Sequence, residues 1–338
     1  MRVAPLVLFV TSEHDDAHIH RLRAVLARRR ARVVVFDPAR FPSEVRLRLT
    51  YEGADRRMLL TADGRETDLA AVSAVYWQRP RAPQASPRVP AEEREWVARQ
   101  STAALDGLWD RLDVLWVPGR RREAEASDAK VRQLEVAERA GMRVPRTLIT
   151  NDPAEALRFY AACEGRVVSK VLRNGAVLHD GEKHLAYTHV FRRRDLHQLE
   201  SVALAPVIFQ ELVPKRIELR VNVVGDRVFA AAIDSTASPF AREDLRRAEH
   251  LVGCTAHTLD SEVQAQCVRI VRDLGITFGA IDMVVTPAGE HVFLEVNAAG
   301  AWMWVEARVG LPIAEALADL MLDGRTKRRR PEVRAERV

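Results

Sequence analysis

Apolar residues in the first third of the chain follow two patterns: short unbroken runs and helical spacing. Residues 6–10 and 32–36 form apolar runs typical of buried strands, and residues 19–30 between them carry apolar side chains at helical intervals. A strand, a helix and a second strand in this order favour an α/β layer with parallel strands. Because the first glycine is Gly53, the turn after the first strand lacks the glycines of a dinucleotide-binding fold. The pattern continues with strands predicted at 74–77 and 114–117 and a long helix at 91–111.

The middle of the chain alternates helical and strand patterns. One helix is predicted at 126–140, where Gly141 ends the helical spacing, and another follows the cap-like pair Asn151-Asp152. Residues 174–184 contain two glycines and read as a flexible loop. The predicted helices are 126–140, 153–162 and the short acidic segment 195–201, and the predicted strands are 147–150, 166–172, 185–191 and 207–213.

Strand patterns dominate the region after residue 213. Alternating apolar and polar residues from Ile217 to Val223 predict a strand with one face toward the core and one polar face. Gly225-Asp226 indicates a hairpin that leads into a strand at 228–233. A second hairpin is predicted at 279–285 and 291–296, with its turn centred on Ala288-Gly289, and helices are predicted at 261–274 and 311–322.

Composition and charge narrow the class of protein. Of the 338 residues, 47% are hydrophobic and 29% charged, as in a globular protein long enough for two or three domains. The net charge of +5 comes entirely from residues 325–338, with seven basic and two acidic side chains, so neither a nucleic-acid nor a membrane partner is indicated. No apolar run approaches the roughly 18 residues of a membrane span, and three widely spaced cysteines exclude a zinc ribbon. We therefore expect a cytoplasmic protein with a disordered basic tail.

The most informative polar cluster lies on the second predicted hairpin. Glu295 and Asn297 are two residues apart on a strand and share a face, and the expected turn places Asp282 opposite Glu295. Three oxygen-bearing side chains on adjacent strands suit Mg²⁺, with a nucleotide's phosphates completing its shell. The alternative is a strand pair with solvated acids. The neighbouring residues are nearly all apolar, and buried acids among them need a cation, which favours the metal site.

Two further groups of charged residues have the chemistry of a phosphate site. Glu218 and Arg220 share the polar face of one strand, with Lys215 just before it, and Arg220 suits a developing phosphoryl charge. A cross-strand ion pair is the alternative for this group. Lys130 and Lys170 stand out because the chain has only five lysines. Either ammonium could bind phosphate as a point charge, and each lysine taken singly also fits a solvated position.

A candidate contact for a nucleotide base lies where a buried strand leads into a turn. The segment Phe209-Gln210-Glu211-Leu212-Val213 ends this strand immediately before Pro214. Such a hinge can present backbone groups to an adenine edge. Its spacing alone is not specific, so its meaning depends on the groups that accompany it.

The order of these groups resembles the ATP-grasp superfamily: two lysines, a hinge, Lys-x-x-Glu-x-Arg, and then Asp and Glu-x-Asn on a hairpin. The chain is also similar to the graspetide (microviridin-type) peptide macrocyclases over roughly residues 5–324. The similarity is specific, because the tryptophan–arginine–proline segment near the N-terminus is not general to ATP-grasp enzymes. The segments that carry it are 75–80 (VYWQRP), 141–151 (GMRVPRTLITN), 187–188, 209–220 (FQELVPKRIELR), 223–226, 278–285, 293–300 and 310–313.

The resemblance implies an ATP-grasp fold of the α/β (α+β) class with an N-terminal α/β pre-ATP-grasp domain. The domains would be residues 1–122, a central ATP-grasp subdomain at 123–203, a C-terminal subdomain with the metal site at 204–324, and the basic tail at 325–338. It also implies ATP and Mg²⁺ as cofactors, a precursor peptide with a leader and an acidic core as partner, and a homodimer.

The resemblance also gives roles to the candidate residues. Arg220 would stabilise the transferring γ-phosphate, and Arg246, in Asp244-Leu245-Arg246 where the family has Asp-Trp-Arg, would contact the acyl-phosphate end. The helix at 195–201 would dock the leader peptide, with Asp195, Gln198 and Leu199 as contacts. ATP would be held by Lys130, Lys170, Gln210, Glu211, Leu212, Val213, Lys215 and Glu218, and Mg²⁺ by Asp282, Glu295 and Asn297.

Three departures from the family pattern bear on the substrate. Residues 297–302 (NAAGAW) stand where the family usually reads Asn-Pro-Asn-Gly-Gln-Trp. Ser169-Lys170-Val171 replaces the common lysine–proline, and the tryptophan before Arg246 is absent. All presumed ATP and metal side chains are present, so these changes concern substrate choice more than catalysis.

We therefore expect an ADP-forming ligase that activates Asp or Glu side chains of a ribosomally made peptide and closes ester or amide rings with Ser/Thr or Lys. One alternative is an ATP-grasp ligase that joins an amino acid or small acid to a peptide or metabolite, and only the acceptor distinguishes the two. Another is a non-catalytic nucleotide-binding scaffold, which the complete metal triad disfavours.

Overall fold

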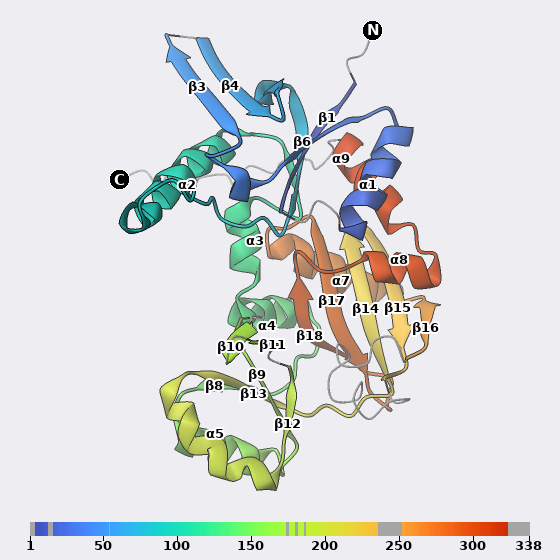
Figure 1. Ribbon diagram of the computed structural model, residues 1–338. Coiled ribbons are helices and arrows are strands. Elements are labelled where there is room, and N and C mark those ends of the chain that lie inside the picture. Colours follow the sequence, from blue (N-terminus) through green and yellow to red (C-terminus); the bar gives the residue numbers. More distant parts are fainter. Residues whose placement is uncertain are drawn as a thin grey trace, which may run out of the picture. The chain divides into compact units, whose positions relative to one another are not determined.

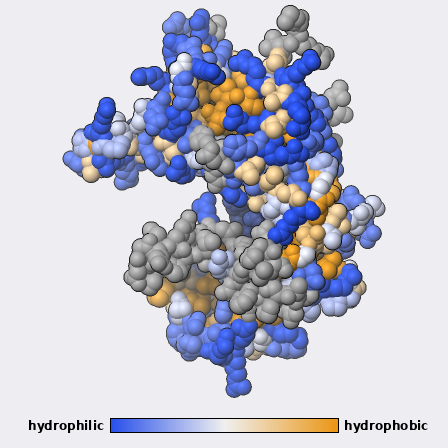
Figure 2. Space-filling model, turned by 45° about the vertical axis from the view of Figure 1, so that its right-hand side comes forward, coloured by the Kyte–Doolittle hydropathy of each residue, from blue (hydrophilic) through white to orange (hydrophobic). Residues whose placement is uncertain are grey.

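The computed structural model describes residues 4–12, 16–53, 55–173, 176–179, 182–185, 187–235 and 252–323. The chain divides into two compact units, one containing the residues up to Val117 together with those from Glu315, and one running from Pro118 to Ala314 (Figure 1). Both contain helices and strands, which confirms the mixed α/β class. Where Figure 2 is coloured, hydrophilic side chains cover most of the surface, and apolar ones gather in patches. Among the described residues, no helix combines the length and apolar character that a membrane span requires.

The first unit is built on a parallel sheet in the order β2 (Arg32–Phe36), β1 (Leu6–Thr11), β6 (Val72–Gln78) and β7 (Leu115–Val117). The helix α1 (Ala17–Arg28) connects β1 to β2, so the predicted parallel strand–helix–strand opening is confirmed. Leu8 of β1 and Leu108 of α2 (Arg94–Arg111) lie in one buried core. Arg21 of α1 pairs with Glu315 of α9 (Ile313–Asp323) at 3.1 Å.

The remaining elements of this unit are short. Residues 91–111, predicted as one helix, begin with the 3-10 turn η3 (Ala91–Glu93) and continue as α2. A small antiparallel sheet contains β3 (Arg46–Glu52), β4 (Asp55–Ala62) and β5 (Arg65–Asp68), and two further 3-10 turns are η1 (Pro38–Arg40) and η2 (Leu69–Ala71).

The second unit begins with two short helices, α3 (Arg121–Ser127) and α4 (Lys130–Arg139). The prediction of one continuous helix at 126–140 is wrong, because Ala129 has an extended backbone, with φ −67° and ψ 109°. The interruption makes Lys130 the first residue of a new helix.

A four-stranded antiparallel sheet follows in the order β12 (His189–Phe191), β9 (Val167–Lys170), β13 (Val207–Glu211) and β8 (Thr147–Thr150). The helix α5 (Pro153–Ala162), capped by Asp152 as predicted, shares a core with the 3-10 helix η4 (Arg193–Leu204). The helix predicted at 195–201 thus exists in a longer and more tightly wound form. Residues 174–184, predicted as a loop, contain a hairpin of β10 (Ala176–His179) and β11 (Glu182–Leu185).

The largest sheet has five antiparallel strands in the order β16 (Cys254–His257), β15 (Arg227–Ile233), β14 (Ile217–Val224), β17 (Phe278–Val285) and β18 (His291–Asn297). The alternation predicted for β14 is confirmed, since Leu219, Val221 and Val223 share a buried core with α4 and α7 (Ser261–Asp273). The helix α8 (Met303–Val309) was not expected from the sequence pattern, and Trp302 before it is fully buried.

The β17–β18 hairpin reaches the predicted pairing by a different route. Hydrogen bonds join Gly289 N to Thr286 O and Thr286 N to Glu290 O, both at 2.9 Å, so the loop has three residues and ends at Gly289 with φ +86°. A three-residue loop with a left-handed last residue is a common hairpin connection. Nearer the middle of β18, Leu294 is an extra residue in a bulge, and Asp282 pairs with Glu295 as predicted.

Candidate active site

Polar side chains gather on the face of the five-stranded sheet opposite the α7 core. Directly opposed residues of antiparallel strands share a face. Arg220 of β14 pairs with Asp282 of β17, and Asp282 pairs with Glu295 of β18, so the three form one row across the sheet. Asn297 lies in the next row, opposite Ala280. The sheet thus brings Arg220 and the three predicted metal ligands onto one surface.

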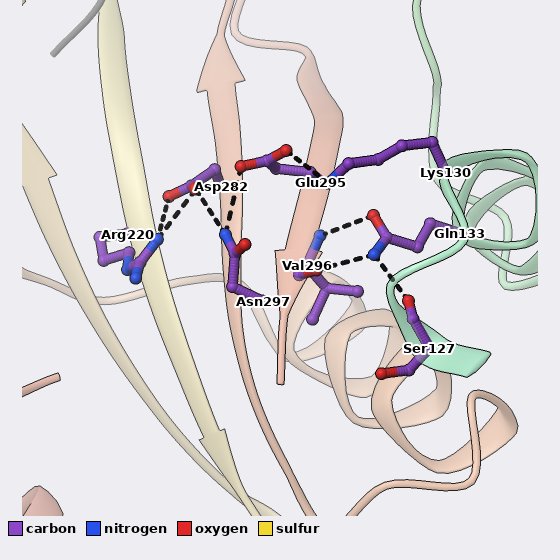
Figure 3. A network of polar contacts seen from close by, with 8 residues as sticks. All are labelled: Ser127, Lys130, Gln133, Arg220, Asp282, Glu295, Val296 and Asn297. Carbon is purple, nitrogen blue, oxygen red and sulfur yellow. Dashed lines mark hydrogen bonds and ion pairs between the residues drawn. The ribbon is translucent and has the colours of Figure 1, made fainter. Parts of the chain in front are cut away.

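Hydrogen bonds join these side chains into one network (Figure 3). Arg220 Nη1 lies 2.7 and 2.8 Å from the two carboxylate oxygens of Asp282. The side-chain amide of Asn297 donates to Asp282 Oδ2 at 3.3 Å and to Glu295 Oε1 at 3.2 Å. The amide therefore holds the two carboxylates side by side.

The bulge at Leu294 is what turns Glu295 toward this network. Phe293 is fully buried in the core against α7, while Leu294 packs with Val284 and Val292 on the other side of the sheet. In an unbroken strand Phe293 and Glu295 would share a face. The extra residue separates them, so the strand can bury an aromatic ring on one side and present a carboxylate on the other.

The donor set fits a hard divalent cation. Two carboxylates and a side-chain amide supply oxygen ligands of the kind that Mg²⁺ takes. The side chains of Asp282 and Glu295 are 33% and 26% exposed, so both carboxylates lie partly open to solvent. Asp282, Glu295 and Asn297 would hold the metal, and this role stays a prediction.

Lys130 joins the network from α4. Its Nζ lies 2.7 Å from Glu295 Oε2, and its side chain is only 13% exposed. Gln133, one turn further along α4, fixes the distance between this helix and β18 (Figure 3). Its Nε2 donates to Val296 O at 2.8 Å and to Ser127 O at 2.7 Å, and its Oε1 accepts from Val296 N at 3.1 Å. Spacing along the sequence gives no indication of this clamp.

Replacing Gln133 by leucine is expected to lower the free energy of unfolding by about 2 kcal/mol or more, because the change leaves buried backbone groups of Val296 unpaired. Urea denaturation would measure this. Gln266→Leu is the matched control, since Gln266 makes one hydrogen bond near the surface, to Gly141 O at 3.2 Å. Equal effects of the two changes would contradict the role of Gln133 as a clamp.

Burial and charge act differently on the two carboxylates. Burial raises the pKa of Asp282, and the guanidinium of Arg220 opposes that shift. Burial would also raise the pKa of Glu295, but Lys130 and, less strongly, Lys170 lower it to about 2. Lys170, at the end of β9, is therefore close enough to act on Glu295. Burial likewise raises the pKa of Asp128, in the interruption between α3 and α4, against the effect of Lys130.

Lys215 and Glu218 form a separate ion pair at the start of β14. Both side chains are 16% exposed. Glu218 pairs across the sheet with Val284, which belongs to an apolar cluster with Val213, Val292 and Leu294. A charged pair beside an apolar surface suits a ribose next to a flat base.

The hinge after β13 is held by the protein's own hydrogen bonds. The backbone N–H of Glu211 donates to Arg146 O at 3.0 Å, and that of Leu212 donates to Arg166 O at 2.9 Å. The amide of the buried Gln210 donates to Thr147 Oγ1 at 3.0 Å, so its side chain supports the strand from within. The hinge conformation is thus fixed by neighbouring strands and loops.

Arg143 is a residue of this region that sequence reasoning missed. Its guanidinium donates to Glu211 Oε1 at 3.0 Å and also pairs with Glu290, at the start of the β18 side of the hairpin. Its carbonyl accepts from Phe293 N at 2.8 Å. One arginine therefore joins the hinge to the hairpin that carries the predicted metal ligands.

Some predicted site residues are placed differently or lie outside the described residues. Arg246 is among the latter. Leu199 is buried in the core beneath α5, and Asp195 uses its carboxylate within η4, accepting from Arg192 N at 2.8 Å. That backbone hydrogen bond lowers the pKa of Asp195. Gln198 is the exposed one of the three residues predicted to dock a leader peptide.

The chain segment after Asn297 lies tightly on the polar face. A Cβ on Gly300 would be 2.4 Å from Ala280 Cβ and 3.0 Å from Arg220 Nη2. Within the described residues, the amide of Asn222 and Nε of Arg220 are buried without hydrogen-bond partners. Unpaired hydrogen-bonding groups of Asn222 and Arg220 therefore lie on the polar face of the sheet against which Gly300 packs.

Comparison with known proteins supports one family over most of the chain. Residues 6–122 match the model of the MvdD pre-ATP-grasp domain. No curated protein matches the chain. Among solved structures, the macrocyclase MdnB from Microcystis aeruginosa MRC is 31% identical with a TM-score of 0.78, and 94% of this chain and 99% of that chain are covered.

Two further structures are similar over the same length. MdnC from the same organism, bound with its precursor peptide MdnA, is 29% identical with a TM-score of 0.83, covering 94% of this chain and 99% of that chain. A RiPP-associated ATP-grasp ligase from Chryseobacterium gregarium, in complex with ADP and a leader and core peptide, is 26% identical with a TM-score of 0.88, covering 94% and 97%. The chain therefore belongs to the ATP-grasp ligases of the graspetide (microviridin-type) macrocyclase family.

Proposed function

We propose that the protein uses ATP to activate Asp or Glu side chains of a ribosomally made precursor peptide and then closes side-chain macrocycles. The observation that carries this proposal is the row of Arg220, Asp282 and Glu295, joined by Asn297 and Lys130. In this arrangement two cationic side chains, which suit phosphate, lie next to two carboxylates, which suit a metal. The ligase from Chryseobacterium gregarium with bound ADP and leader and core peptide, and MdnC with its bound precursor peptide, support the same interpretation.

The first step is a phosphoryl transfer. A carboxylate oxygen of the peptide bonds to the γ-phosphorus, the bond to the β–γ bridging oxygen breaks, and ADP leaves. Charge develops on the equatorial phosphate oxygens, where Arg220 stabilises it. Mg²⁺, held by Asp282, Glu295 and Asn297, would neutralise phosphate charge when bound.

The second step is acyl transfer. A Lys amine or a Ser/Thr hydroxyl of the same peptide bonds to the acyl carbon, the bond to the phosphate oxygen breaks, and inorganic phosphate leaves with the proton released to solvent. The products are an amide or an ester. Most of the catalytic effect comes from positioning and charge stabilisation.

The nucleotide is expected to span the four-stranded and the five-stranded sheets of the second unit. Lys130 and Lys170 would contact phosphates, Glu218 with Lys215 the ribose side, and the backbone of Glu211, Leu212 and Val213 the adenine edge, with Gln210 supporting that strand. Arg246 would contact the acyl phosphate. The 3-10 helix η4 is expected to dock the leader peptide. Its exposed Gln198 would contact the leader, and its buried Asp195 and Leu199 would stabilise the conformation of η4.

The proposal also includes the metal, the oligomeric state and the cellular location. We expect Mg²⁺ as the metal, a homodimer and a cytoplasmic location, as the family resemblance and the composition indicate. The four segments expected from the sequence (residues 1–122, 123–203, 204–324 and 325–338) stay part of this proposal.

Trapping the acyl phosphate tests the proposed chemistry. Hydroxylamine added with ATP, Mg²⁺ and an acidic precursor peptide is expected to convert the activated side chain to a hydroxamate, visible by mass spectrometry. ADP formation should depend on the peptide. Hydroxamate on an added small acid, with none on the peptide, would instead favour the ligase that acts on metabolites.

The close approach of Gly300 gives a further prediction. Gly300→Ala is expected to push residues 298–302 off the sheet and lower kcat/KM about tenfold or more, with a loss of about 1–3 kcal/mol in stability. Steady-state kinetics and urea denaturation would measure both. Gly253→Ala is the control, because a Cβ there meets nothing within 4 Å. Unchanged kinetics in Gly300→Ala would show that the segment is not tied to the reacting groups.

A further inference from the structure

The two carboxylates proposed to bind the metal form ion pairs with the two cationic side chains proposed to bind ATP. Both oxygens of Asp282 lie within 2.8 Å of Arg220 Nη1, and Glu295 Oε2 lies 2.7 Å from Lys130 Nζ. The exposed fractions of the four side chains run from 11% for Arg220 to 33% for Asp282. Each ion pair is thus partly withdrawn from water, where its attraction is stronger than at an exposed surface.

A divalent metal and these two cations compete for the same oxygens. Mg²⁺ binds carboxylate oxygen at about 2.1 Å. A metal on Asp282 or Glu295 would therefore stand close to Arg220 or Lys130, and like charges so close repel strongly in a partly buried site. The metal can bind fully only if both cations leave the carboxylates for another anionic partner.

Phosphate oxygens can be that partner. Lys130 is a point charge and Arg220 a planar fork, and both suit phosphate. Nucleotide without metal would draw the cations away and leave Asp282 and Glu295 without countercharge. Metal without nucleotide would leave the cations without an anion. Only the two ligands together give every charged group a new partner.

We propose that Lys130 and Arg220 have a second role as resident cations of the metal site, so that metal and nucleotide bind together through an exchange of partners. This inference rests on the proposed function. It gives Lys130 opposite effects on the two ligands, because the ammonium attracts phosphate and opposes metal bound alone. Asn297, which donates to both carboxylates, keeps them aligned during the exchange.

Replacing Lys130 by methionine separates these effects, because methionine keeps much of the length and loses the charge. Mn²⁺ is the probe, titrated into the full-length protein without nucleotide and followed by electron paramagnetic resonance. Lys130→Met is expected to bind Mn²⁺ alone about tenfold more tightly than the unmodified protein. It is expected to bind metal-free ADP more weakly.

Lys215→Met is the matched control. Lys215 pairs with Glu218, which lies outside the metal triad, so its loss should weaken ADP binding and leave Mn²⁺ affinity unchanged. Arg220→Met provides a second test at Asp282, with tighter Mn²⁺ binding expected in the absence of nucleotide.

Equal or weaker Mn²⁺ binding by Lys130→Met and Arg220→Met proteins with unchanged circular dichroism would overturn the exchange. If the unmodified protein nevertheless binds Mn²⁺ together with ADP, the proposed function stands. If no variant binds Mn²⁺ with or without ADP, the metal assignment fails and the exchange fails with it.

Discussion

Arg220→Ala is expected to lower kcat/KM for peptide-dependent ADP formation by about a thousandfold. The guanidinium lies on the row that carries Asp282 and is hydrogen-bonded to that carboxylate, next to the proposed metal and phosphate site. Its loss removes a stabilising charge where the transition state gains negative charge. A coupled assay for ADP, at a temperature well below the unfolding transition, measures the effect.

Arg220→Lys is the companion variant. Lysine keeps the positive charge but cannot present a planar fork, so it should restore only part of the lost rate. Full turnover by Arg220→Ala would remove the basis of the assignment. If Arg220→Ala loses the circular dichroism signal of the folded protein, the rate of Arg220→Lys alone tests the assignment, and full turnover by that variant would contradict a need for the planar fork.

Glu295→Gln is expected to reduce turnover by at least a hundredfold and to weaken metal binding in the presence of nucleotide. The amide keeps the size of the side chain but loses the charge that a divalent metal requires. Lys130 then faces a neutral group in a partly buried position, which is unfavourable. Mn²⁺ binding with ADP present, measured beside the rate, distinguishes a lost metal from a misfolded protein.

Glu290→Gln controls for the loss of a carboxylate on the same hairpin. Glu290 pairs with Arg143 and is far more exposed than Glu295, at 50% against 26%. The control should retain most of its activity. If both variants lose activity equally, the effect belongs to the hairpin as a whole and not to a metal ligand.

The β-rich half of the fold could be predicted because its strands have one apolar and one polar face. In β14 this alternation separates Leu219 and Val221 from Glu218 and Arg220. The parallel sheet of the first unit could also be predicted, since buried parallel strands appear in the sequence as unbroken apolar runs. Local patterns of this kind depend only on neighbouring residues.

The pairing of Asp282 with Glu295 was predicted correctly, although the turn was not. The sequence favours a turn centred between two residues, whereas the structure has a three-residue loop that shifts the register by one. The bulge at Leu294 shifts it back. A bulge carries little sequence signal, because its extra residue is as apolar as its neighbours.

Contacts between distant segments could not be predicted. Gln133 and Val296 are 163 positions apart, and Arg143 and Glu211 are 68 apart. Nothing in the spacing of a glutamine or an arginine along a helix or loop indicates which strand it will meet. The interruption at Ala129 could not be predicted either, since alanine favours helix and the residue nevertheless has an extended backbone.

The most direct test of the central claim is the intact mass of an acidic precursor peptide, leader included, after incubation with the protein, ATP and Mg²⁺. The account predicts the loss of one water for every ring closed, with ADP formed in step and no loss when Arg220→Ala replaces the unmodified protein. A gain equal to an amino-acid residue, or ADP formed with the peptide mass unchanged, would contradict macrocyclisation.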